Sequence, residues 1–284
     1  MGLLDRLRRR RPEQVSSKAP PPMPAARPQP REWRPVKAPI RYEGSNFRMV
    51  EGLDDVKAAL DLAMRKQHET RVTGEDRRLH VLLAGPPGVS KSLLLLEAEK
   101  EIPQERRVFV LGSQVSKAGL RNRLLSSPSS IDFVLIDELD KMGREDYDVL
   151  LSMMESGRIS VLKAGMAADA RVLATVLATA NYLERIPVEL LDRFLILYVE
   201  SYDSQDFVRV ATRLLRERGA MPPEEASALA AVLWNSGFRS IRDVVRVANA
   251  ARGEPEKAYQ LIEIMRARSP PSELVRSRGW RPRR

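Results

Sequence analysis

Short apolar runs and helical periodicities alternate along the chain from residue 48 to about residue 200. The runs at 80–84, 107–112, 133–137, 172–180 and 194–199 predict strands, of which 80–84 and 172–180 are expected to be buried. Between them, apolar residues recur at helical spacing in 51–64, 91–100, 116–125, 144–156 and 188–193. Strands that alternate with helices indicate a parallel sheet with helices on both faces. We therefore expect an α/β fold for this part of the chain.

Other patterns complete the outline. The polar residues 67–78 predict a loop, and residues 159–162 and 170–172 predict a hairpin with Lys163 near its tip. After residue 204 the periodicity is helical only, at 204–217, 223–235, 239–252 and 255–267, with Gly219, Gly237 and Gly253 between the helices. We expect four segments: an arm (1–40), an α/β domain (41–201), a small helical domain (202–267) and a tail (268–284).

Charge is distributed unevenly over these segments. The chain carries a formal net charge of +10, to which residues 1–47 contribute +7 and residues 266–284 contribute +6, so residues 48–265 carry −3. Residues 12–39 contain nine prolines, the composition of a disordered or polyproline linker. The basic ends are therefore expected to be solvated arms or arms that touch nucleic acid or an acidic partner.

Composition also excludes several classes of protein. The chain has no cysteine and two histidines, so neither disulfides nor a thiolate zinc site is expected. It has no apolar run of the roughly 18 residues that a membrane span needs. The first residues lack the apolar region of a secretion signal, and we expect a cytoplasmic location.

The first chemical motif follows the apolar run 80–84. A Gly/Pro turn leads into a helix that opens with Lys91 and Ser92, so backbone N–H groups and a helix N-terminus face an anion. This pattern predicts a nucleotide phosphate loop, in which Lys91 neutralises the β and γ phosphates and Ser92 places its hydroxyl on Mg²⁺. Ser90 stands where the strict motif has Gly, but its side chain is small. The predicted nucleotide-binding residues are Gly85, Pro86, Pro87, Gly88, Val89, Ser90, Lys91, Ser92, Leu93 and, from the next motif, Asp137.

The second motif is the acidic end of the run 133–137. Asp137 and Glu138 follow four apolar residues, which places both carboxylates at the carboxyl end of a parallel strand, expected to neighbour the strand of the phosphate loop. Asp137 is a candidate for holding Mg²⁺ through water, and Glu138 is a candidate for orienting the attacking water. Together the motifs predict an Mg²⁺-dependent site for a nucleoside triphosphate.

The order and spacing of further segments resemble the AAA+ ATPases. The similarity is greatest to the branch that contains the mini-chromosome maintenance (MCM) helicases and the MoxR-type remodelling ATPases, and it covers about residues 48–252. MCM phosphate loops also admit a small residue at the Ser90 position. The segments that carry the resemblance are 116–120, Ile136–Met142, 154–155, 159–161, 163–165, Leu177–Asn181 and Leu190–Phe194.

The resemblance implies Mg²⁺-dependent ATP hydrolysis at the two motifs and roles for residues outside them. Asn181 matches sensor 1, which helps Glu138 hold the lytic water. Arg193 matches the arginine finger, which reaches the γ phosphate of a neighbouring subunit and implies a homo-oligomeric ring, expected to be a hexamer. Arg239 matches sensor 2, with Arg242 as a rival one turn later.

Two other matches concern the adenine and the substrate. Leu53–Val56 match the segment beside the adenine, and the following α/β and helical parts match the nucleotide-binding domain and its lid. Lys163 matches the hairpin lysine that touches DNA in the pore of MCM rings.

Departures from the MCM pattern leave the substrate open. Ten residues separate Leu120 from Ile131, too few for the helix-2 insertion, and we expect neither the N-terminal oligonucleotide-binding domain nor a C-terminal winged helix. Helicase activity is therefore left open. Three interpretations stand: a DNA motor, a MoxR-like ATPase that remodels proteins, and a nucleotide-dependent scaffold that recruits partners through its Pro-rich arm. The hairpin region 159–171 has no aromatic residue to grip a polypeptide, which slightly favours DNA.

Overall fold

The computed structural model describes residues 44–268 except 45, 48, 51, 164 and 165, and side chains at 160–169 are likewise outside the description. The predictions for the arm 1–40 and for residues 269–284 therefore concern residues outside the described part. Among the helices that are described, none combines the length and the apolar composition needed to cross a bilayer.

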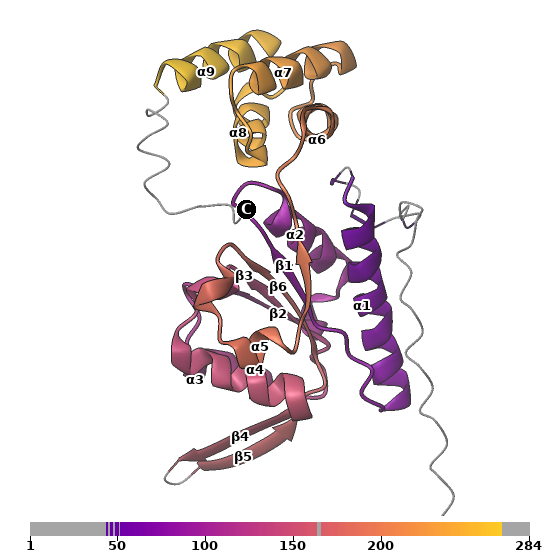
Figure 1. Cartoon of the computed structure of the whole chain (residues 1–284). Coiled ribbons are helices and arrows are strands. Elements are labelled where there is room, and N and C mark those ends of the chain that lie inside the picture. Colours follow the sequence, from indigo (N-terminus) through magenta and orange to yellow (C-terminus); the bar gives the residue numbers. More distant parts are fainter. Residues whose placement is uncertain (1–43, 45, 48, 51, 164–165, 269–284) are drawn as a thin grey trace, which may run out of the picture. The chain divides into compact units, whose positions relative to one another are not determined.

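Five parallel strands form the central sheet in the order β2-β3-β6-β1-β7 (Figure 1). The predicted parallel sheet is confirmed, with one correction: β3, which ends at Asp137, does not neighbour β1, because β6 lies between them. The site therefore draws on three adjacent strand ends. The strands are β1 (Val81–Ala84), β2 (Arg107–Leu111), β3 (Phe133–Asp137), β6 (Thr175–Ala180) and β7 (Leu195–Tyr198).

Helices cover both faces of this sheet, α1 and α2 on one and α3, α4 and α5 on the other (Figure 1). Side chains of a strand alternate between faces. In β3, Phe133 and Leu135 pack with the first group of helices, whereas Val134 and Ile136 pack with the second. A strand that is covered on both faces is apolar throughout, which is why the sequence shows a continuous run there. The helices are α1 (Asp54–Thr73), α2 (Lys91–Glu101), α3 (Lys117–Ser126), α4 (Arg144–Ser156) and α5 (Val188–Leu191).

Helix α1 is longer than its sequence pattern predicts. Residues 67–73 were expected in a loop because they are polar, yet they continue the helix to Thr73. Gln67 is buried and hydrogen-bonds at both ends of its amide: Nε2 donates to the carbonyl of Leu173 at 2.8 Å, and Oε1 accepts from the hydroxyl of Thr175 at 2.8 Å. Hydrophobic periodicity misses a buried face that is polar but fully hydrogen-bonded.

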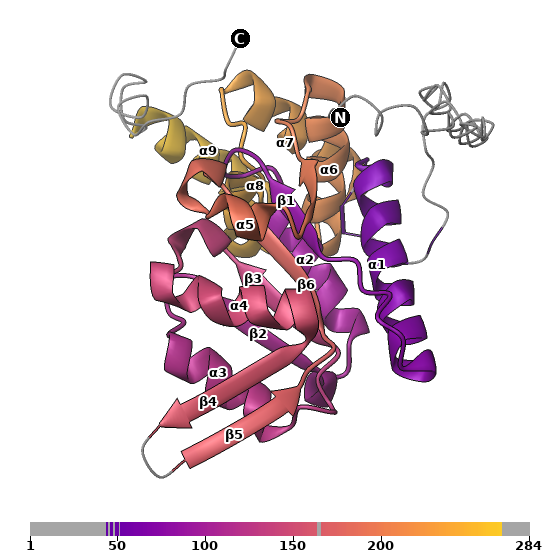
Figure 2. The ribbon, with the colours of Figure 1, turned by 60° about the horizontal axis from the view of Figure 1, so that its bottom comes forward.

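Strands β4 (Arg158–Lys163) and β5 (Met166–Arg171) form the predicted antiparallel hairpin (Figure 2). The backbone of Lys163 pairs with that of Met166 in the last register position before the turn. The side chain of Lys163 is outside the described part of the chain. Between α3 and β3, residues 127–132 make a direct connection without a further helix or strand.

In the described part of the chain, four helices follow the sheet and enclose a hydrophobic core of their own. They begin and end within two residues of the predicted positions, and Gly237 and Gly253 adopt the left-handed conformation at φ 86° and 85°, as expected for glycines after helix ends. The domain boundary at residues 201 and 202 stays a prediction. The helices are α6 (Ser204–Glu217), α7 (Pro223–Asn235), α8 (Ile241–Ala251) and α9 (Pro255–Ala267).

Candidate nucleotide-binding site

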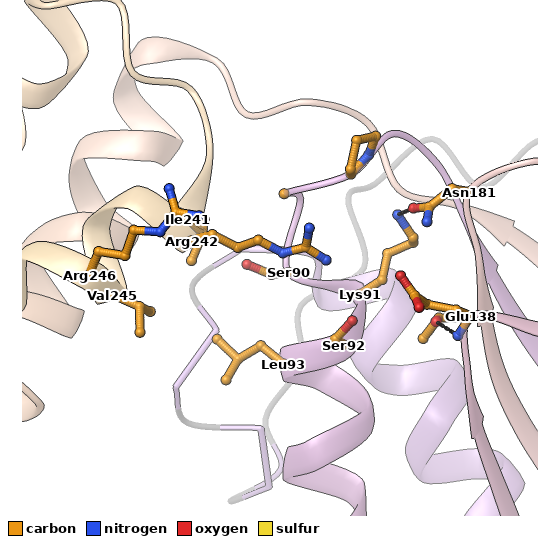
Figure 3. A pocket seen from close by; sticks show the side chains of 13 residues that line it. Ser90, Lys91, Ser92, Leu93, Glu138, Asn181, Ile241, Arg242, Val245 and Arg246 are labelled. Atoms are coloured by element: carbon orange, nitrogen blue, oxygen red, sulfur yellow. Dashed lines mark hydrogen bonds between the residues drawn. The ribbon is translucent and has the colours of Figure 1, made fainter. Parts of the chain in front are cut away.

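A pocket of about 350 Å³ lies at the carboxyl ends of the central strands, between the phosphate loop and the first turns of α8 (Figure 3). This volume is in the range of small-molecule sites. Residues from four separate parts of the chain line the pocket: Pro87, Gly88, Ser90, Lys91, Ser92, Leu93, Glu138, Thr179, Asn181, Ile241, Arg242, Val245 and Arg246.

Two glycines of the phosphate loop sit where no side chain fits. A Cβ atom on Gly85 would lie 2.2 Å from the backbone oxygen of Val199, and one on Gly88 would lie 2.5 Å from the hydroxyl of Ser240. Gly88 also has φ 89°, and its carbonyl accepts a hydrogen bond of 3.1 Å from the backbone N–H of Ile241. The loop therefore contacts the N-terminus of α8 directly, and this contact holds α8 beside the pocket.

Ser90 adopts a left-handed conformation, with φ 67° and ψ 10°, immediately before α2. This explains why the strict motif has Gly here: the position requires a positive φ, which costs an L-residue about 1–2 kcal/mol. The serine accepts this conformation in a buried place, with 7% of its surface exposed. Its role in binding phosphate stays a prediction.

Lys91 opens α2 and is buried, with 5% of its surface exposed. Its ammonium donates hydrogen bonds to the carbonyls of Gly85 and Pro86, at 2.7 and 2.6 Å, and to Oδ1 of Asn181 at 3.0 Å (Figure 3). Burial, and secondly the charge of Arg242, lower the pKa of Lys91 to about 8. A phosphate anion beside the ammonium would favour its charged form and so oppose both effects.

Asp137 is held by two hydroxyl groups. Its Oδ1 accepts from Ser92 Oγ at 2.9 Å and from Thr179 Oγ1 at 2.6 Å, and Thr179 Oγ1 in turn accepts from the backbone N–H of Glu138 at 3.0 Å. Sequence reasoning did not assign a role to Thr179; its only signal was a hydroxyl residue near the end of an apolar run. Thr179 fixes the acidic end of β3 to the end of β6.

The oxygens of Ser92 and Asp137 also fit a magnesium ion. Mg²⁺ prefers oxygen ligands and is commonly held by one or two protein groups together with the substrate phosphates. Within the described residues, no cluster of three or more His, Cys, Asp or Glu side chains could hold a metal alone. The donor set therefore suits an ion that arrives with a nucleotide.

Glu138 lines the pocket in a left-handed conformation, with φ 61° and ψ 52°. A Cβ atom on Gly112 would lie 2.1 Å from its carbonyl oxygen, so the neighbouring loop passes very close. Its carboxylate forms an ion pair with Lys141 at 2.7 Å, which the sequence pattern did not predict.

Asn181 follows β6 and lines the pocket, whereas Arg193 does not. Arg193 Nη2 donates to the carboxylate of Glu155 at 2.9 Å, and its side chain is 42% exposed. The described part of its own chain therefore does not direct Arg193 to the nucleotide pocket. Its role toward a neighbouring subunit stays a prediction.

The two candidates for sensor 2, Arg239 and Arg242, lie in different places. The guanidinium of Arg239 lies 3.6 Å above the ring of Trp234 and donates to the carbonyls of Trp234 and Phe238, away from the pocket lining. Arg242, in the first turn of α8, lines the pocket (Figure 3). Arg239 precedes the N-cap Ser240, and the contact of α8 with the phosphate loop presents the following turn instead. The geometry thus favours Arg242 over the predicted Arg239.

The segment predicted to lie beside the adenine is also outside the pocket lining. Val56 is buried with 3% exposure, and Leu53 packs against the same core. A contact of Leu53–Val56 with a nucleotide base stays a prediction.

Comparison with known proteins identifies the family. The model of the MCM P-loop domain matches residues 43–206. DNA replication licensing factor MCM2 of Arabidopsis thaliana is 32% identical over 149 residues, which are 46% of this chain and 16% of that protein. DNA helicase MCM8 of Mus musculus is 33% identical over 152 residues, which are 47% of this chain and 18% of that protein. The matched region thus spans less than a fifth of the length of either relative.

Solved structures show the same fold. The Holliday junction branch migration motor RuvB of Thermotoga maritima superposes with a TM-score of 0.53 at 20% identity, covering 75% of this chain and 70% of that chain. A mutant of the same protein gives a TM-score of 0.55 at 21% identity, with the same coverage. At this identity the similarity concerns the fold alone. Since the family model covers more than half of the sequence, the chain belongs to the MCM P-loop domain family of AAA+ ATPases.

Proposed function

We propose that this protein hydrolyses ATP in a ring of identical subunits and uses the energy to move or remodel DNA. The observation that carries the proposal is the convergence, in one pocket at the carboxyl ends of parallel strands, of the phosphate loop, Glu138, Asn181 and Arg242. These groups have the chemistry that phosphoryl transfer needs, which is positioning and charge neutralisation.

Each side chain has a part in this reaction. Lys91 leaves the loop carbonyls to bind the β and γ phosphates, and Arg242 adds a second positive charge from α8. Glu138 orients the attacking water, and Asn181 supports that water from the adjacent strand end. Magnesium, held through Ser92 and Asp137, would neutralise phosphate charge.

The exposure of Arg193 is consistent with a ring of subunits. An arginine that acts as a finger must lie on the surface of its own subunit, and its ion pair with Glu155 is solvent-exposed on both sides, with side chains 42% and 61% exposed. Exposed ion pairs contribute about 0–1 kcal/mol and exchange partners readily. Arg193 is therefore available to a phosphate on the neighbouring subunit.

The DNA substrate is supported by the position of Lys163 at the end of the β4–β5 hairpin and by the names of the relatives, which are replication licensing factors and a DNA helicase. A protein substrate, as for MoxR-type ATPases, is the alternative. The basic residues in 1–47 and 266–284 would add sequence-independent attraction to phosphates.

Hydrolysis is tested by measuring phosphate release with and without Mg²⁺ for the wild type and for Glu138→Gln. We expect turnover that needs Mg²⁺, and a loss of at least about 100-fold in Glu138→Gln, since the amide cannot orient water as a carboxylate does. Binding of ATP should persist in this variant. Hydrolysis at the wild-type rate in Glu138→Gln would remove Glu138 from the proposal.

The substrate is tested by adding single- and double-stranded DNA to the ATPase assay and by measuring DNA binding at 50 and 200 mM salt. We expect DNA to stimulate hydrolysis and binding to weaken at least about 10-fold at the higher salt. Lys163→Ala should reduce stimulation. Lys117→Ala is the matched control, because Lys117 belongs to α3 and not to the hairpin, and its ammonium pairs with Asp148. If DNA neither stimulates nor binds, a protein substrate is favoured.

A further inference from the structure

Asp140 is a buried carboxylate for which neither motif accounts. It lies in the 3₁₀ turn η2 (Leu139–Lys141), directly after Glu138, and 4% of its surface is exposed. Within the described residues, no Lys or Arg nitrogen forms an ion pair with it. A buried carboxylate without a direct ion pair is costly, so its presence here calls for a physical role.

The hydrogen bonds of Asp140 lead to the pocket. Its Oδ1 accepts from the backbone N–H of Asn181 at 3.0 Å. The side chain of the same Asn181 accepts from the ammonium of Lys91 at 3.0 Å. Asp140 thus holds the backbone of the residue that contacts the phosphate-binding lysine. Two residues that the proposed function uses are connected through it.

The other carboxylate oxygen, Oδ2, is buried and has no hydrogen-bond partner among the described residues. The negative charge lies near Lys91, where it raises the pKa of that lysine against the larger effect of burial. The effect of this charge on Lys91 is smaller than that of burial, so the direct contact of Asp140 with the site is its hydrogen bond to Asn181.

We propose that Asp140 is a positioning residue that fixes the turn after β6, so that Asn181 points its amide at the pocket and at Lys91. The residue after a strand end has free backbone torsions unless its N–H or C=O is held, and the N–H of Asn181 is held by Asp140 alone among the described residues. This inference rests on the proposed ATPase function and adds a residue that sets the geometry of sensor 1.

The full-length chain is tested as wild type, Asp140→Ala, Asp140→Asn, Asn181→Ala and the double variant Asp140→Ala/Asn181→Ala. We expect Asp140→Ala to lower kcat about 10- to 100-fold, with KM changed less than about threefold. Asp140→Asn keeps an acceptor and should recover a large part of this loss. The double variant should be no slower than Asn181→Ala, because Asp140 acts through Asn181.

Additive losses in the double variant, or a wild-type kcat in Asp140→Ala, would overturn the proposal. If Asp140→Ala does not fold, Asp140→Leu takes its place, since it fills the volume without burying a charge.

A second readout does not depend on hydrolysis. The backbone amide of Asn181 should exchange with solvent hydrogen at least about 10-fold faster in Asp140→Ala and Asp140→Leu than in the wild type, and Asp140→Asn should restore slow exchange. If the wild type hydrolyses no ATP but the exchange differs in this way, the proposed function fails and the contact of Asp140 stands. Equal exchange in all four proteins would contradict the proposal, whatever the ATPase result.

Discussion

Lys91 lines the pocket, and its charge state depends on what the pocket contains. Without a ligand, its pKa is about 8, because it is buried and faces Arg242. Phosphate oxygens would raise that pKa, since they favour the charged form. Nucleotide binding and proton uptake are therefore expected to be coupled at mildly alkaline pH.

The coupling can be measured by calorimetry of ATP binding in two buffers that differ in ionisation enthalpy. At pH 8 about half of the free protein carries neutral Lys91, so binding should take up about half a proton through this group. At pH 6.5 the lysine is already charged, so proton uptake through Lys91 should be close to zero. Lys91→Arg, which stays charged at both values, is the control. Equal proton uptake at pH 8 and 6.5, or unchanged uptake in Lys91→Arg, would contradict the assignment.

Residues with a fixed spacing in one segment could be predicted from the sequence, and residues that meet across segments could not. Lys91 and Ser92 follow the glycine turn directly, and Asp137 ends an apolar run, so their proximity follows from strand direction. Thr179 and Asp140 gain their places only from hydrogen bonds between β3, η2 and β6. Both residues lie in segments that carry the family resemblance, but the local sequence does not indicate the contacts that they make.

At the scale of elements, the start of β1 is tied to β6 by a histidine. His80 Nδ1 accepts from the backbone N–H of Val176 at 2.9 Å, and burial, followed by the charge of Arg78, lowers the pKa of His80 from 6.5 to about 4. The acceptor nitrogen must be unprotonated. Protonation of His80 would therefore break this hydrogen bond between the start of β1 and β6.

The direction of this effect follows from the two pKa values. The unfolded chain titrates near pH 6.5 and the folded chain near 4, so the unfolded state binds more protons between these values. The free energy of unfolding should therefore fall as the pH is lowered from 6.5 to 4, by an amount on the order of 3 kcal/mol for this group. Urea unfolding at pH 7, 6, 5 and 4 measures this fall in the free energy of unfolding. His80→Asn, which keeps an acceptor near the Nδ1 position without titrating, should show a shallower dependence; an equal slope in both proteins would rule out His80 as the cause.

Helix α8 is the element whose exact start decides which arginine faces the nucleotide. Its N-cap Ser240 lies against Gly88, and Arg242 is therefore the first arginine to reach the pocket. A sequence pattern cannot distinguish two arginines three residues apart, because the choice depends on the contact between the helix and a loop some 150 residues earlier in the chain. Arg239 is held instead by the ring of Trp234.

The two arginines can be compared by substitution. Arg242→Ala should weaken ATP binding about 10- to 100-fold, the effect of losing one charge-assisted contact of about 1.5–3 kcal/mol. Arg239→Ala should change affinity less than about twofold. Titration with a fluorescent ATP analogue distinguishes them. A larger loss in Arg239→Ala than in Arg242→Ala would restore the assignment that the sequence resemblance favours.

At the scale of the whole molecule, the alternation of apolar runs and helical periodicities predicted the parallel sheet, because helices pack on both of its faces and inner strands such as β1 and β3 are covered on both sides. Helical periodicity alone predicted the helices that follow it. The length of α1 could not be predicted, because the buried face of its last turns includes the polar residue Gln67, which is stabilised there by hydrogen bonds. Nor does one chain contain the complete proposed site: Arg193 lies on the surface, paired with Glu155. In the proposed ring, Arg193 of a neighbouring subunit would complete the site.

This last expectation can be tested by mixing two inactive variants. Glu138→Gln cannot orient water but still offers Arg193, and Arg193→Ala lacks the finger but keeps Glu138. Each alone should hydrolyse ATP at least about 50-fold more slowly than the wild type. In mixed rings of equal parts, roughly a quarter of the interfaces by random assortment combine an intact Glu138 with a neighbour's intact Arg193, and phosphate release should recover accordingly.

The control replaces the first partner by the double variant Glu138→Gln/Arg193→Ala, which offers neither group, so that its mixture with Arg193→Ala should stay inactive. Exchange of subunits is verified separately with differently labelled chains, because recovery requires mixed rings. If labelled subunits exchange and the first mixture still hydrolyses no faster than its parts, Arg193 does not act across the subunit boundary. Recovery in the first mixture alone would place the arginine on one subunit and the water-orienting carboxylate on the next, since neither variant can supply both groups to one site.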